Sequence, residues 1–426
     1  MAVSKLVLGI NARNYLYLRA MNRPSAIARA DNKLATKQVL IDAEVATTPL
    51  IATFSSFREA RSFDWETISG DFVLKPARGY GGAGITVIRE WNGRLGFDPK
   101  GDHVTAVNLE TEIFGILDGA HSLNNVSDEA FLEERVIVSR TLRRLAAGGV
   151  PDIRIIVYNR MPIMAMLRMP TINSHGKANL HQGALGIGID MRTGITTRGV
   201  LFGAPVKRIP GSHTKVHGIK IPAWDRILEI AIGAHCASGL GYSGIDIVLD
   251  EKRGPLVLEI NARPGLQIQL ANGASLRTRL ERVEGMLVPS NSYGIDLAKH
   301  MFAEHRLSHI TDRRHILGVT EMVTIFGPKG SRTFRAKIDT GAYRSAIDKD
   351  IANELGLLRI KETVIIKNAT GHQKRQIFST AIRIRGHRKE TSVSIADRSS
   401  LAFPMIIGRQ DLQGFLIDPS LDSDIR

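Results

Sequence analysis

Three oxygen-bearing side chains in one predicted β-hairpin are the clearest chemical signal in the sequence. Residues 241–266, GYSGIDIVLDEKRGPLVLEINARPGL, predict two short apolar strands joined by a polar turn at 251–254. If the turn is centred in the middle of Glu-Lys-Arg-Gly, Asp246 lies directly opposite Glu259. Because strand side chains alternate with a period of two, Asn261 then falls on the same face as Glu259.

This face of the hairpin could bind a divalent cation. Two carboxylates directly opposite each other on paired strands repel, which destabilises the pair. A hard cation such as Mg²⁺ would remove that conflict, because it accepts carboxylate and amide oxygens. The same pattern also allows a half-buried hairpin whose acids lie by chance on the solvent face.

A glycine-rich loop follows a strand-borne lysine in residues 71–90, DFVLKPARGYGGAGITVIRE. The apolar run FVL leads to Lys75, the loop spans 79–84, and a second apolar run, ITVI, follows. Glycines let backbone N–H groups approach a ligand closely, so the loop could wrap phosphate oxygens with the lysine beside them. It is not a Walker loop, because no Gly-Lys-Ser/Thr ends it and strands flank it. The alternative is a flexible hairpin without a ligand.

Two further predicted strands, DIRIIVYN and PIMAMLRM, carry Asp152, Arg154 and Arg168. Arginines on neighbouring strands can clamp phosphates or carboxylates, although a solvated position at the rim of a sheet is the commoner fate of arginine. Downstream, Asn179 and His181 lie near the start of another strand, and we expect His181 to be structural rather than a general base.

Helices and strands alternate around these groups and predict a chain of mixed α/β structure. Residues 1–50 are mainly helical in pattern, with Asp31 and Asn32 placed to cap the run LATKQVLIDAEV. An amphipathic helix ending in AIGAHCASGL leads into the hairpin, and we expect Cys236 to be buried within it. The run FLEERVIV at 131–138 predicts a strand of mixed acidic and apolar residues.

Composition narrows the class of protein. A length of 426 residues suggests two or three domains, and 43% hydrophobic with 23% charged residues is typical of a globular protein. No apolar run is long enough to span a bilayer, and the N-terminus lacks a signal-peptide pattern, so we expect a cytoplasmic protein without a membrane partner. A single cysteine excludes an intrachain disulfide and a cysteine zinc site.

The net charge of +15 indicates an acidic partner such as nucleotide phosphates or an acidic peptide. Nucleic acid is the less favoured partner, because the positive charge is scattered and aromatic residues make up only 6% of the chain.

The order of these motifs resembles the ATP-grasp superfamily, and most closely its glutamate-ligase branch that modifies a ribosomal protein. The likeness covers roughly residues 5–300, and its most specific pieces are DIR at 152–154, NLHQGA at 179–184, and GIDIVL followed by EINARPGL. The resemblance implies an α/β domain at 1–312 whose two subdomains grip ATP between antiparallel sheets.

The resemblance also implies roles for individual residues. Those that would bind the nucleotide, as the cofactor ATP, are Lys75, Gly79, Gly81, Gly82, Gly84, Glu133, Glu134, Val136 and Arg154. Two Mg²⁺ ions, with Mn²⁺ as an alternative, would be held by Asp246, Glu259 and Asn261. Arg168 would meet the γ-phosphate and the acyl phosphate, and Asn179 would lie beside the acyl acceptor. Arg263 departs from the branch, which usually has a small residue there, and would add positive charge beside the reaction centre.

The chain changes character after residue 312. Short β-patterned runs predict a small all-β domain at 313–426. The segments KIDTGAYRSAID, which contains Asp339, and FPMIIGR resemble the retropepsin-like domain associated with these ligases, a domain also labelled a zinc protease. No HExxH zinc motif is present. Aspartic-protease chemistry needs two carboxylates that share a proton, so Asp339 as a catalytic residue predicts a homodimer through this domain. A domain that only binds peptide or dimerises is the alternative.

The sequence therefore predicts an ATP-dependent carboxylate–amine ligase. The enzyme would form an amide or peptide bond through an acyl phosphate, adding glutamate or another amino acid to a peptide or small amine, with the peptide-handling domain fused behind it. The rival hypothesis is a peptide- or nucleic-acid-binding protein whose nucleotide site regulates affinity without turnover.

Overall fold

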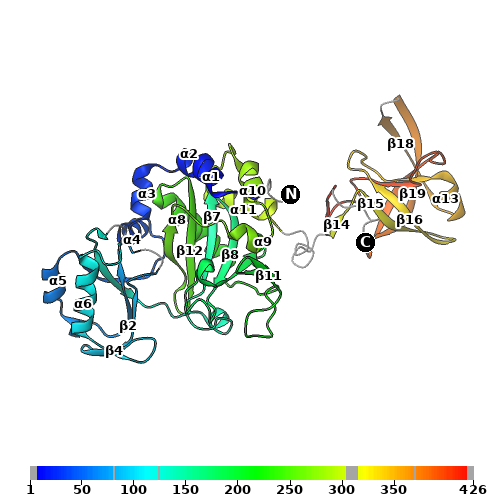
Figure 1. Ribbon diagram of the computed structural model, residues 1–426. Coiled ribbons are helices and arrows are strands. Elements are labelled where there is room, and N and C mark those ends of the chain that lie inside the picture. The colour runs from blue at the N-terminus through cyan, green and yellow to red at the C-terminus, as the bar shows by residue number, and fades with distance from the viewer. Residues whose placement is uncertain (1–6, 80–81, 123–124, 304–314, 369–370, 420–426) are drawn as a thin grey trace. The chain divides into compact units, whose positions relative to one another are not determined.

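The computed structural model describes residues 7–79, 82–122, 125–303, 315–368 and 371–419, with backbone alone for 315 and 358–375. The chain divides into two compact units, Met1–Leu307 and Ser308–Arg426 (Figure 1). The predicted boundary between residues 312 and 313 lies outside the described residues. No helix in the described part of the chain is both long and apolar enough to cross a membrane.

A six-stranded antiparallel sheet forms the smaller layer of the first unit, in the order β1-β6-β2-β3-β4-β5. Its strands are β1 (Leu50–Phe54), β2 (Gly70–Pro76), β3 (Thr86–Trp91), β4 (Leu95–Phe97), β5 (His103–Thr105) and β6 (Ala130–Glu134). Helices α5 (Phe57–Ser62) and α6 (Ala106–Leu117) lie along one side of it (Figure 1). An aromatic cluster that includes Trp65, Phe72 and Trp91 fills its core. The glycine-rich loop therefore joins two paired strands, β2 and β3, as predicted.

A seven-stranded antiparallel sheet forms the larger layer, in the order β11-β10-β9-β8-β7-β12-β13. Its strands are β7 (Asp152–Tyr158), β8 (Met161–Met169), β9 (Leu185–Ile189), β10 (Thr196–Leu201), β11 (Ala204–Val206), β12 (Tyr242–Asp250) and β13 (Gly254–Asn261). The helices that pack on this sheet are α8 (Trp224–Ser238), α9 (Ile268–Asn272), α10 (Leu276–Val283) and α11 (Asn291–Met301). All nine residues of β12 are buried, so the central hairpin lies inside the main hydrophobic core.

The N-terminal residues form helices, as expected. Their segments are α1 (Ile10–Ala12), the π-helix η2 (Arg13–Leu18), α2 (Arg19–Met21), α3 (Pro24–Ala30) and α4 (Lys33–Asp42). The Asn32 side chain caps α4 by accepting a hydrogen bond from the backbone N–H of Ala35 at 2.9 Å. Asp31 does not cap this helix, because its carboxylate binds an arginine of the larger sheet region instead.

The expectation that Cys236 is buried in α8 is wrong, because the side chain is exposed. Its neighbour His235 takes the buried position, with 3% exposure. Successive residues of an α-helix differ by about 100° around the axis, so an error of one residue moves a side chain off the apolar face.

The described residues of the second unit form a β-barrel and one short helix, α13 (Lys349–Glu354). Six strands close a ring in the order β15-β16-β21-β17-β20-β19 and back to β15, and β18 pairs outside it with β19. The ring strands are β15 (Thr320–Gly327), β16 (Gly330–Ile338), β17 (Ala346–Asp348), β19 (Gly371–Ile384), β20 (His387–Ala396) and β21 (Met405–Ile407). The remaining strands are β14 (His315–Leu317), β18 (Leu358–Asn368) and β22 (Phe415–Ile417).

Candidate active site

Asp246 pairs with Glu259 in the central hairpin, as predicted, but the turn that joins the two strands differs from the predicted one. Asp250 pairs with Gly254, so a three-residue loop centred on Lys252 joins the strands, and Gly254 has a φ of 76°. Between Ile247 and the turn, each residue of β12 pairs one position away from its predicted partner on β13. A β-bulge between Asp246 and Ile247 then restores the predicted register from Asp246 onward. Bulges are frequent beside functional sites, because they redirect a side chain.

The predicted metal-binding side chains meet at this pairing. Asn261 donates a hydrogen bond from Nδ2 to Oδ2 of Asp246 at 3.0 Å. Asp246 is buried, whereas the side chain of Glu259 is 37% exposed and reaches the surface of a pocket. The sheet therefore brings two carboxylates and one amide onto one face, as the sequence predicts.

Two arginines already bind the carboxylate of Asp246. Arg154 binds Asp246 with both arms of its guanidinium, at 2.7 and 2.6 Å. Arg168 binds Asp152 at 2.5 and 2.6 Å and reaches Oδ2 of Asp246 at 2.7 Å. Both arginine side chains are at most 12% exposed, so the alternative of solvated rim positions is wrong. Repulsion between Asp246 and Glu259 therefore does not by itself require a cation.

The pKa shifts in this cluster follow from burial and from those arginines. Burial raises the pKa of Asp152 to about 6, and the charge of Arg168 offsets the rise only in part. Burial also acts to raise the pKa of Asp246, but Arg154 and Arg168 together outweigh it and hold that pKa below its ordinary value. Asp246 is thus the carboxylate that stays charged, which a cation ligand or an arginine clamp requires.

The donor set matches Mg²⁺ in chemical type. Carboxylates of Asp246 and Glu259 and the amide of Asn261 supply oxygen ligands, and Glu259 has only a long contact, 3.8 Å from Nζ of Lys33. Asp246 accepts four hydrogen bonds, three at Oδ2 and one at Oδ1, so Oδ1 is the oxygen with a lone pair left for a cation. Among the described residues, no group of three or more His, Cys, Asp or Glu side chains could hold a metal, and the predicted set has two acids.

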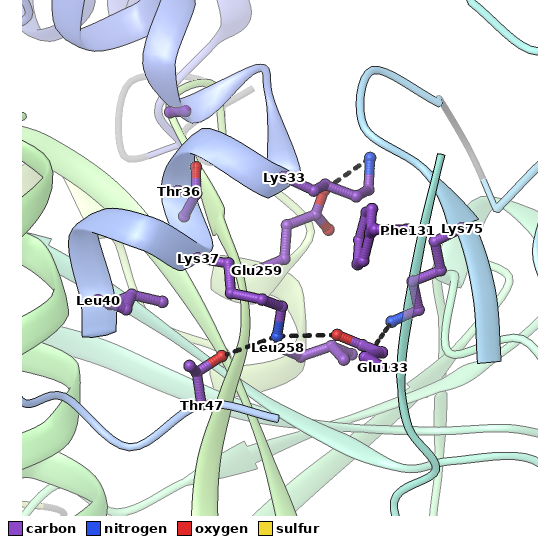
Figure 2. A pocket seen from close by; sticks show the side chains of 11 residues that line it. Lys33, Thr36, Lys37, Leu40, Thr47, Lys75, Phe131, Glu133, Leu258 and Glu259 are labelled. Carbon is purple, nitrogen blue, oxygen red and sulfur yellow. Dashed lines mark hydrogen bonds and ion pairs between the residues drawn. The ribbon is translucent and has the colours of Figure 1, made fainter. Parts of the chain in front are cut away.

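A pocket opens between the two sheets of the first unit (Figure 2). It has about 350 Å³ of open space, part of it continuous with solvent. Its walls come from α4, β2, β6 and β13, and the lining residues are Ala30, Lys33, Thr36, Lys37, Leu40, Thr47, Lys75, Phe131, Glu133, Leu258 and Glu259. Glu259 belongs both to this pocket and to the predicted metal face, so the two features form one site.

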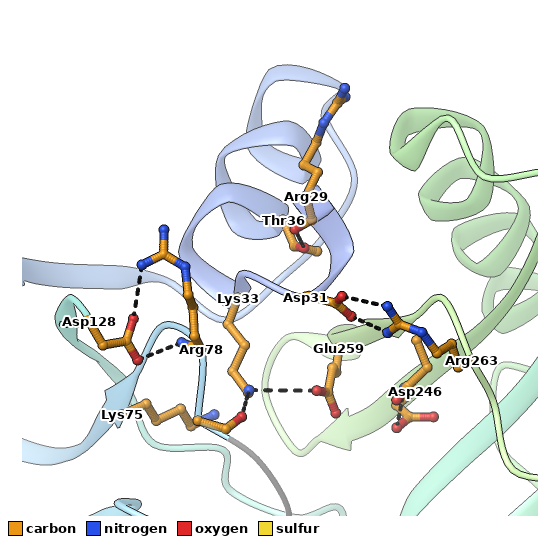
Figure 3. A network of polar contacts seen from close by, with 12 residues as sticks. Arg29, Asp31, Lys33, Thr36, Lys75, Arg78, Asp128, Asp246, Glu259 and Arg263 are labelled. Carbon is orange, nitrogen blue, oxygen red and sulfur yellow. Dashed lines mark hydrogen bonds and ion pairs between the residues drawn. The ribbon is translucent and has the colours of Figure 1, made fainter. Parts of the chain in front are cut away.

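Three lysines and one buried glutamate dominate the pocket. Glu133 forms ion pairs with Lys75 and with Lys37, the latter at 2.9 Å, and accepts a hydrogen bond from Thr48 at 2.6 Å. Burial acts to raise the pKa of Glu133, but the two lysines lower it to about 2. Lys33 donates to the carbonyl of Gly79 at 2.5 Å, at the start of the glycine-rich loop (Figure 3).

The other predicted nucleotide ligands lie on the same part of the fold. Glu134 forms an ion pair with Arg253, and Val136 packs in a small apolar cluster. These are side-chain contacts, so the backbone contacts with adenine and ribose stay a prediction. Gly82 and Gly84 have φ values of 79° and 69°, which favour glycine.

Gly79 and Gly84 are also restricted by the space around them. A Cβ at Gly84 would come within 2.6 Å of the ring of His121, and one at Gly79 within 2.2 Å of Pro76, so neither position has room for a side chain. Gly81 lies outside the described residues.

Asn179 caps a short 3₁₀ turn, η5 (Leu180–Gln182), by accepting a hydrogen bond from the N–H of His181 at 3.0 Å. Its described contacts are local and do not connect it to Arg168 or to the metal face, so its acceptor-site role stays a prediction. The side chain of His181 is exposed, and its role stays a prediction.

Arg263 lies on the loop after β13, and its positive charge is paired with an acid. Its guanidinium binds the carboxylate of Asp31 in a two-armed ion pair at 2.7 and 2.9 Å (Figure 3). The pair connects the loop after β13 to the segment between α3 and α4. Sequence reasoning had assigned Asp31 to helix capping, because it precedes a helical run.

The sequence analysis missed Lys33 and Lys37. Their spacing of four residues puts both on one face of α4, and that spacing is the signal that could have revealed them. A pair of lysines on a short helix is normally interpreted as a solvated face, so only the position of α4 against the sheets shows that Lys37 is 5% exposed.

In the second unit, Asp339 directly follows β16 and begins a tight turn. Its Oδ1 accepts hydrogen bonds from the backbone N–H groups of Gly341 and Ala342 at 2.9 and 3.1 Å. Its own N–H donates to the carbonyl of Ile407 on β21, which pairs in parallel with β16. A Cβ at Gly408 would come within 2.6 Å of the Arg344 backbone, so this close packing beneath the turn needs glycine.

Two antiparallel sheets with a lysine-lined pocket between them, and a pair of opposed acids of which one lines the pocket, are typical of an ATP-grasp protein. The sequence profile of a family described as "Sugar-transfer associated ATP-grasp" matches residues 12–285. The chain belongs to this family.

Curated relatives match shorter stretches. A protein described as a probable alpha-L-glutamate ligase from Coxiella burnetii is 51% identical over 57 residues, covering 13% of this chain and 17% of the relative. A probable alpha-L-glutamate ligase from Sodalis glossinidius is 25% identical over 191 residues, covering 42% of this chain and 53% of the relative. The chain thus spans between about a sixth and about half of the length of these relatives.

Among solved structures, the ATP-grasp ligase PsnB in complex with the precursor peptide PsnA2 and AMPPNP is 16% identical, with a TM-score of 0.33 and coverage of 61% of each chain. Similarity at this level bears on neither substrate nor mechanism.

Proposed function

We propose that the protein is an ATP-dependent carboxylate–amine ligase that adds glutamate or another amino acid to a peptide or small amine. One observation supports this most directly. Glu259 both lines the lysine-rich pocket and lies opposite Asp246, so a nucleotide in the pocket would direct its phosphates toward the acids and arginines. The names of the curated relatives agree with glutamate as the substrate.

Two of the pocket lysines, Lys33 and Lys75, would bind and orient the polyphosphate. Lys33 and Lys75 come from opposite walls of the pocket, and Lys33 already contacts the first residue of the glycine-rich loop. Asp246, Glu259 and Asn261 would hold Mg²⁺, which lowers the repulsion between ATP and an approaching anion when it is bound. The loop would cover the phosphates through its backbone N–H groups and keep water from the reaction.

Arg168 and Arg154 would stabilise the charge that develops during the reaction. A substrate carboxylate oxygen attacks the γ-phosphorus, the bond to the bridging oxygen breaks, and ADP leaves. An amine nitrogen then attacks the acyl carbon, loses a proton, and expels phosphate. Because both first reactants are anions, fixed guanidinium groups beside the γ-phosphate lower the barrier most where negative charge concentrates. Asp152 holds Arg168 in place with two hydrogen bonds.

Product analysis tests the proposal. Full-length protein with ATP and Mg²⁺ is screened for ADP release over amino acids and short peptides, and mass measurement identifies the products. A ligase releases phosphate only when both a carboxylate and an amine are present, and the product mass equals the sum of the substrates minus water. A nucleotide-regulated binding protein, the rival function, would bind ATP with no such coupled release, and that result would refute the ligase proposal.

We further propose that the second unit is a retropepsin-like, peptide-handling domain. The turn at Asp339, which is held by two backbone N–H groups above the Ile407–Gly408 segment, supports this proposal. The described residues of one chain supply one such Asp-Thr-Gly turn, so cleavage would need a homodimer. If Asp339→Asn leaves every peptide-cleavage assay unchanged, a binding role is the better description.

A further inference from the structure

Arg13 is a buried arginine in an unusual place. It is 9% exposed and is the first residue of the π-helix η2, a type of helix that often occurs at functional sites. Its Nη1 donates to the carbonyl of Pro264 at 2.8 Å, and its Nε and Nη2 donate to Oδ1 of Asn14 at 3.1 and 2.8 Å. Among the described residues none of these partners is an acid. A buried cation without an anionic partner is costly, so its retention calls for an explanation.

Arg263 lies directly before Pro264 and presents a second guanidinium to the same region. Burial lowers the pKa of Arg13, Tyr242 opposes that shift, and the charge of Arg263 lowers it further. The hydrogen bond from Nη1 of Arg13 to the carbonyl of Pro264, the residue after Arg263, places Arg13 beside the loop that carries Arg263. Arg263 holds the carboxylate of Asp31 in a flat, two-armed geometry. The guanidinium of Arg263 therefore already has the geometry that binds a carboxylate through two parallel hydrogen bonds.

The loop that carries Arg263 lies against the predicted reaction centre. Gly244, two residues before Asp246, leaves room for Pro264, because a Cβ there would come within 2.5 Å of that ring. The Cβ position of Gly265 is 4.0 Å from Nη1 of Arg154. In the view of Figure 3, Arg263 and Asp246 lie on the same side of Glu259, away from Lys75.

We propose that Arg13 and Arg263 form a subsite for the α-carboxylate of an amino acid substrate, and that Asp31 occupies the fork of Arg263 when no substrate is bound. This inference rests on the proposed ligase function, in the case where a peptide supplies the activated carboxylate and the amino acid supplies the amine.

The charge of each substrate group decides which carboxylate belongs here. The carboxylate that becomes the acyl phosphate is consumed as a free anion, so a tight two-armed arginine contact would stabilise the ground state and oppose activation. The α-carboxylate of the amino acid that supplies the amine keeps its charge from binding to product release. Two arginines can therefore hold it throughout and fix the position of the amine.

Direct binding tests the subsite without turnover. Full-length protein is saturated with AMPPNP and Mg²⁺, and each of the twenty L-amino acids is titrated calorimetrically. For the amino acid that binds most tightly, we expect its α-carboxamide to bind at least tenfold more weakly. Arg263→Gln should weaken binding of the free acid about tenfold and abolish the preference for acid over amide. Arg277→Gln, which breaks an exposed ion pair with Glu281, is the matched control and should leave both affinities unchanged.

Asp31→Asn separates a substrate subsite from a structural ion pair. Removal of the competing carboxylate should strengthen acid binding severalfold, opposite in sign to Arg263→Gln. If both substitutions weaken binding equally, the ion pair only holds the loop, and the proposal is wrong. Arg13→Lys, which keeps the charge in case Arg13→Gln does not fold, should weaken acid binding less than Arg13→Gln.

Two negative results are distinguishable. If AMPPNP binds the wild type but no amino acid does, the subsite is overturned while the nucleotide site stands. If AMPPNP does not bind, the proposed function itself fails.

Discussion

At the scale of single residues, Lys33 and Lys37 are four positions apart but should have different roles. Lys33 has a 3.8 Å contact with Glu259 and one hydrogen bond to a loop carbonyl, so Lys33→Met should change the free energy of unfolding by less than about 1 kcal/mol. It should weaken AMPPNP binding about tenfold, because one charge-assisted phosphate contact is lost. Calorimetric titration and urea unfolding measure the two effects.

Lys37 is the matched contrast. It is buried against Glu133 and Thr48, so Lys37→Met leaves a buried carboxylate with one fewer partner and should cost about 3 kcal/mol of folding stability. The measurement is urea unfolding of both variants in parallel. Equal stability of the Lys33 and Lys37 variants would contradict the assignment of Lys37 to a structural ion cluster.

Arg168 should matter for turnover more than for nucleotide affinity. Arg168→Lys keeps a positive charge between Asp152 and Asp246 but cannot reproduce the two-armed contact, so the fold should survive. We expect ADP release to fall about a hundredfold, in line with the loss of one preorganised donor of about 3 kcal/mol, with AMPPNP affinity within a factor of three. Near-normal ADP release from this variant would show that Arg168 does not act on the transition state.

Local patterns revealed some of these residues and not others. Asp246, Glu259 and Asn261 could be predicted because strand periodicity and a short turn fix their pairing. The partners Arg154 and Asp31 could not, since each contact joins residues far apart in the sequence. An arginine in the sequence, such as Arg263, indicates a positive charge. Only the tertiary contacts show whether an acid already pairs with that charge.

At the scale of elements, helix α8 packs a histidine against strand β12. Nδ1 of His235 lies 2.8 Å from Oγ of Ser243, and burial lowers the pKa of His235 to about 4. His235 therefore stays neutral in the folded protein between pH 6.5 and 4, whereas in the unfolded chain it binds a proton in this pH range. Stability is complete above the unfolded pKa and is lost as the pH falls through this window.

The expected loss from His235 between pH 7.5 and 5.0 is about 2 kcal/mol of unfolding free energy. Urea unfolding at both pH values measures it in the wild type and in His235→Gln, which cannot titrate. The variant should show a smaller decrease by about that amount. An identical pH dependence in the two proteins would mean that His235 is charged in the fold.

Element types were more predictable than their irregularities. The apolar runs and turn residues predicted the β2–β3 and β12–β13 hairpins, because each pattern is local. The bulge next to Asp246 and the π-helical turn at 13–18 could not be predicted, since both depend on how neighbouring elements pack. These irregularities lie beside the candidate site, where the side chains need directions that regular elements do not give.

At the scale of the whole molecule, the sequence signalled two parts through a change in strand pattern, and the described residues form two compact units. Each hydrophobic cluster is confined to one unit: one cluster lies in the second unit and three lie in the first. The sequence could not predict the pocket between the two sheets. Most of the residues that line it come from α4 and three strands, and the lining spans more than two hundred positions.

Separate cores predict separate unfolding. Calorimetry of the full-length protein should show two transitions, because no described cluster is shared between the units. AMPPNP with Mg²⁺ at a hundredfold excess over its dissociation constant should stabilise the first unit by about 2.7 kcal/mol and shift only that transition upward. Lys33→Met, at the same ligand concentration, should reduce the shift without changing the second transition. A single transition that moves as a whole with nucleotide would show that the two units fold as one cooperative body, and the nucleotide site would then be coupled to the barrel that carries Asp339.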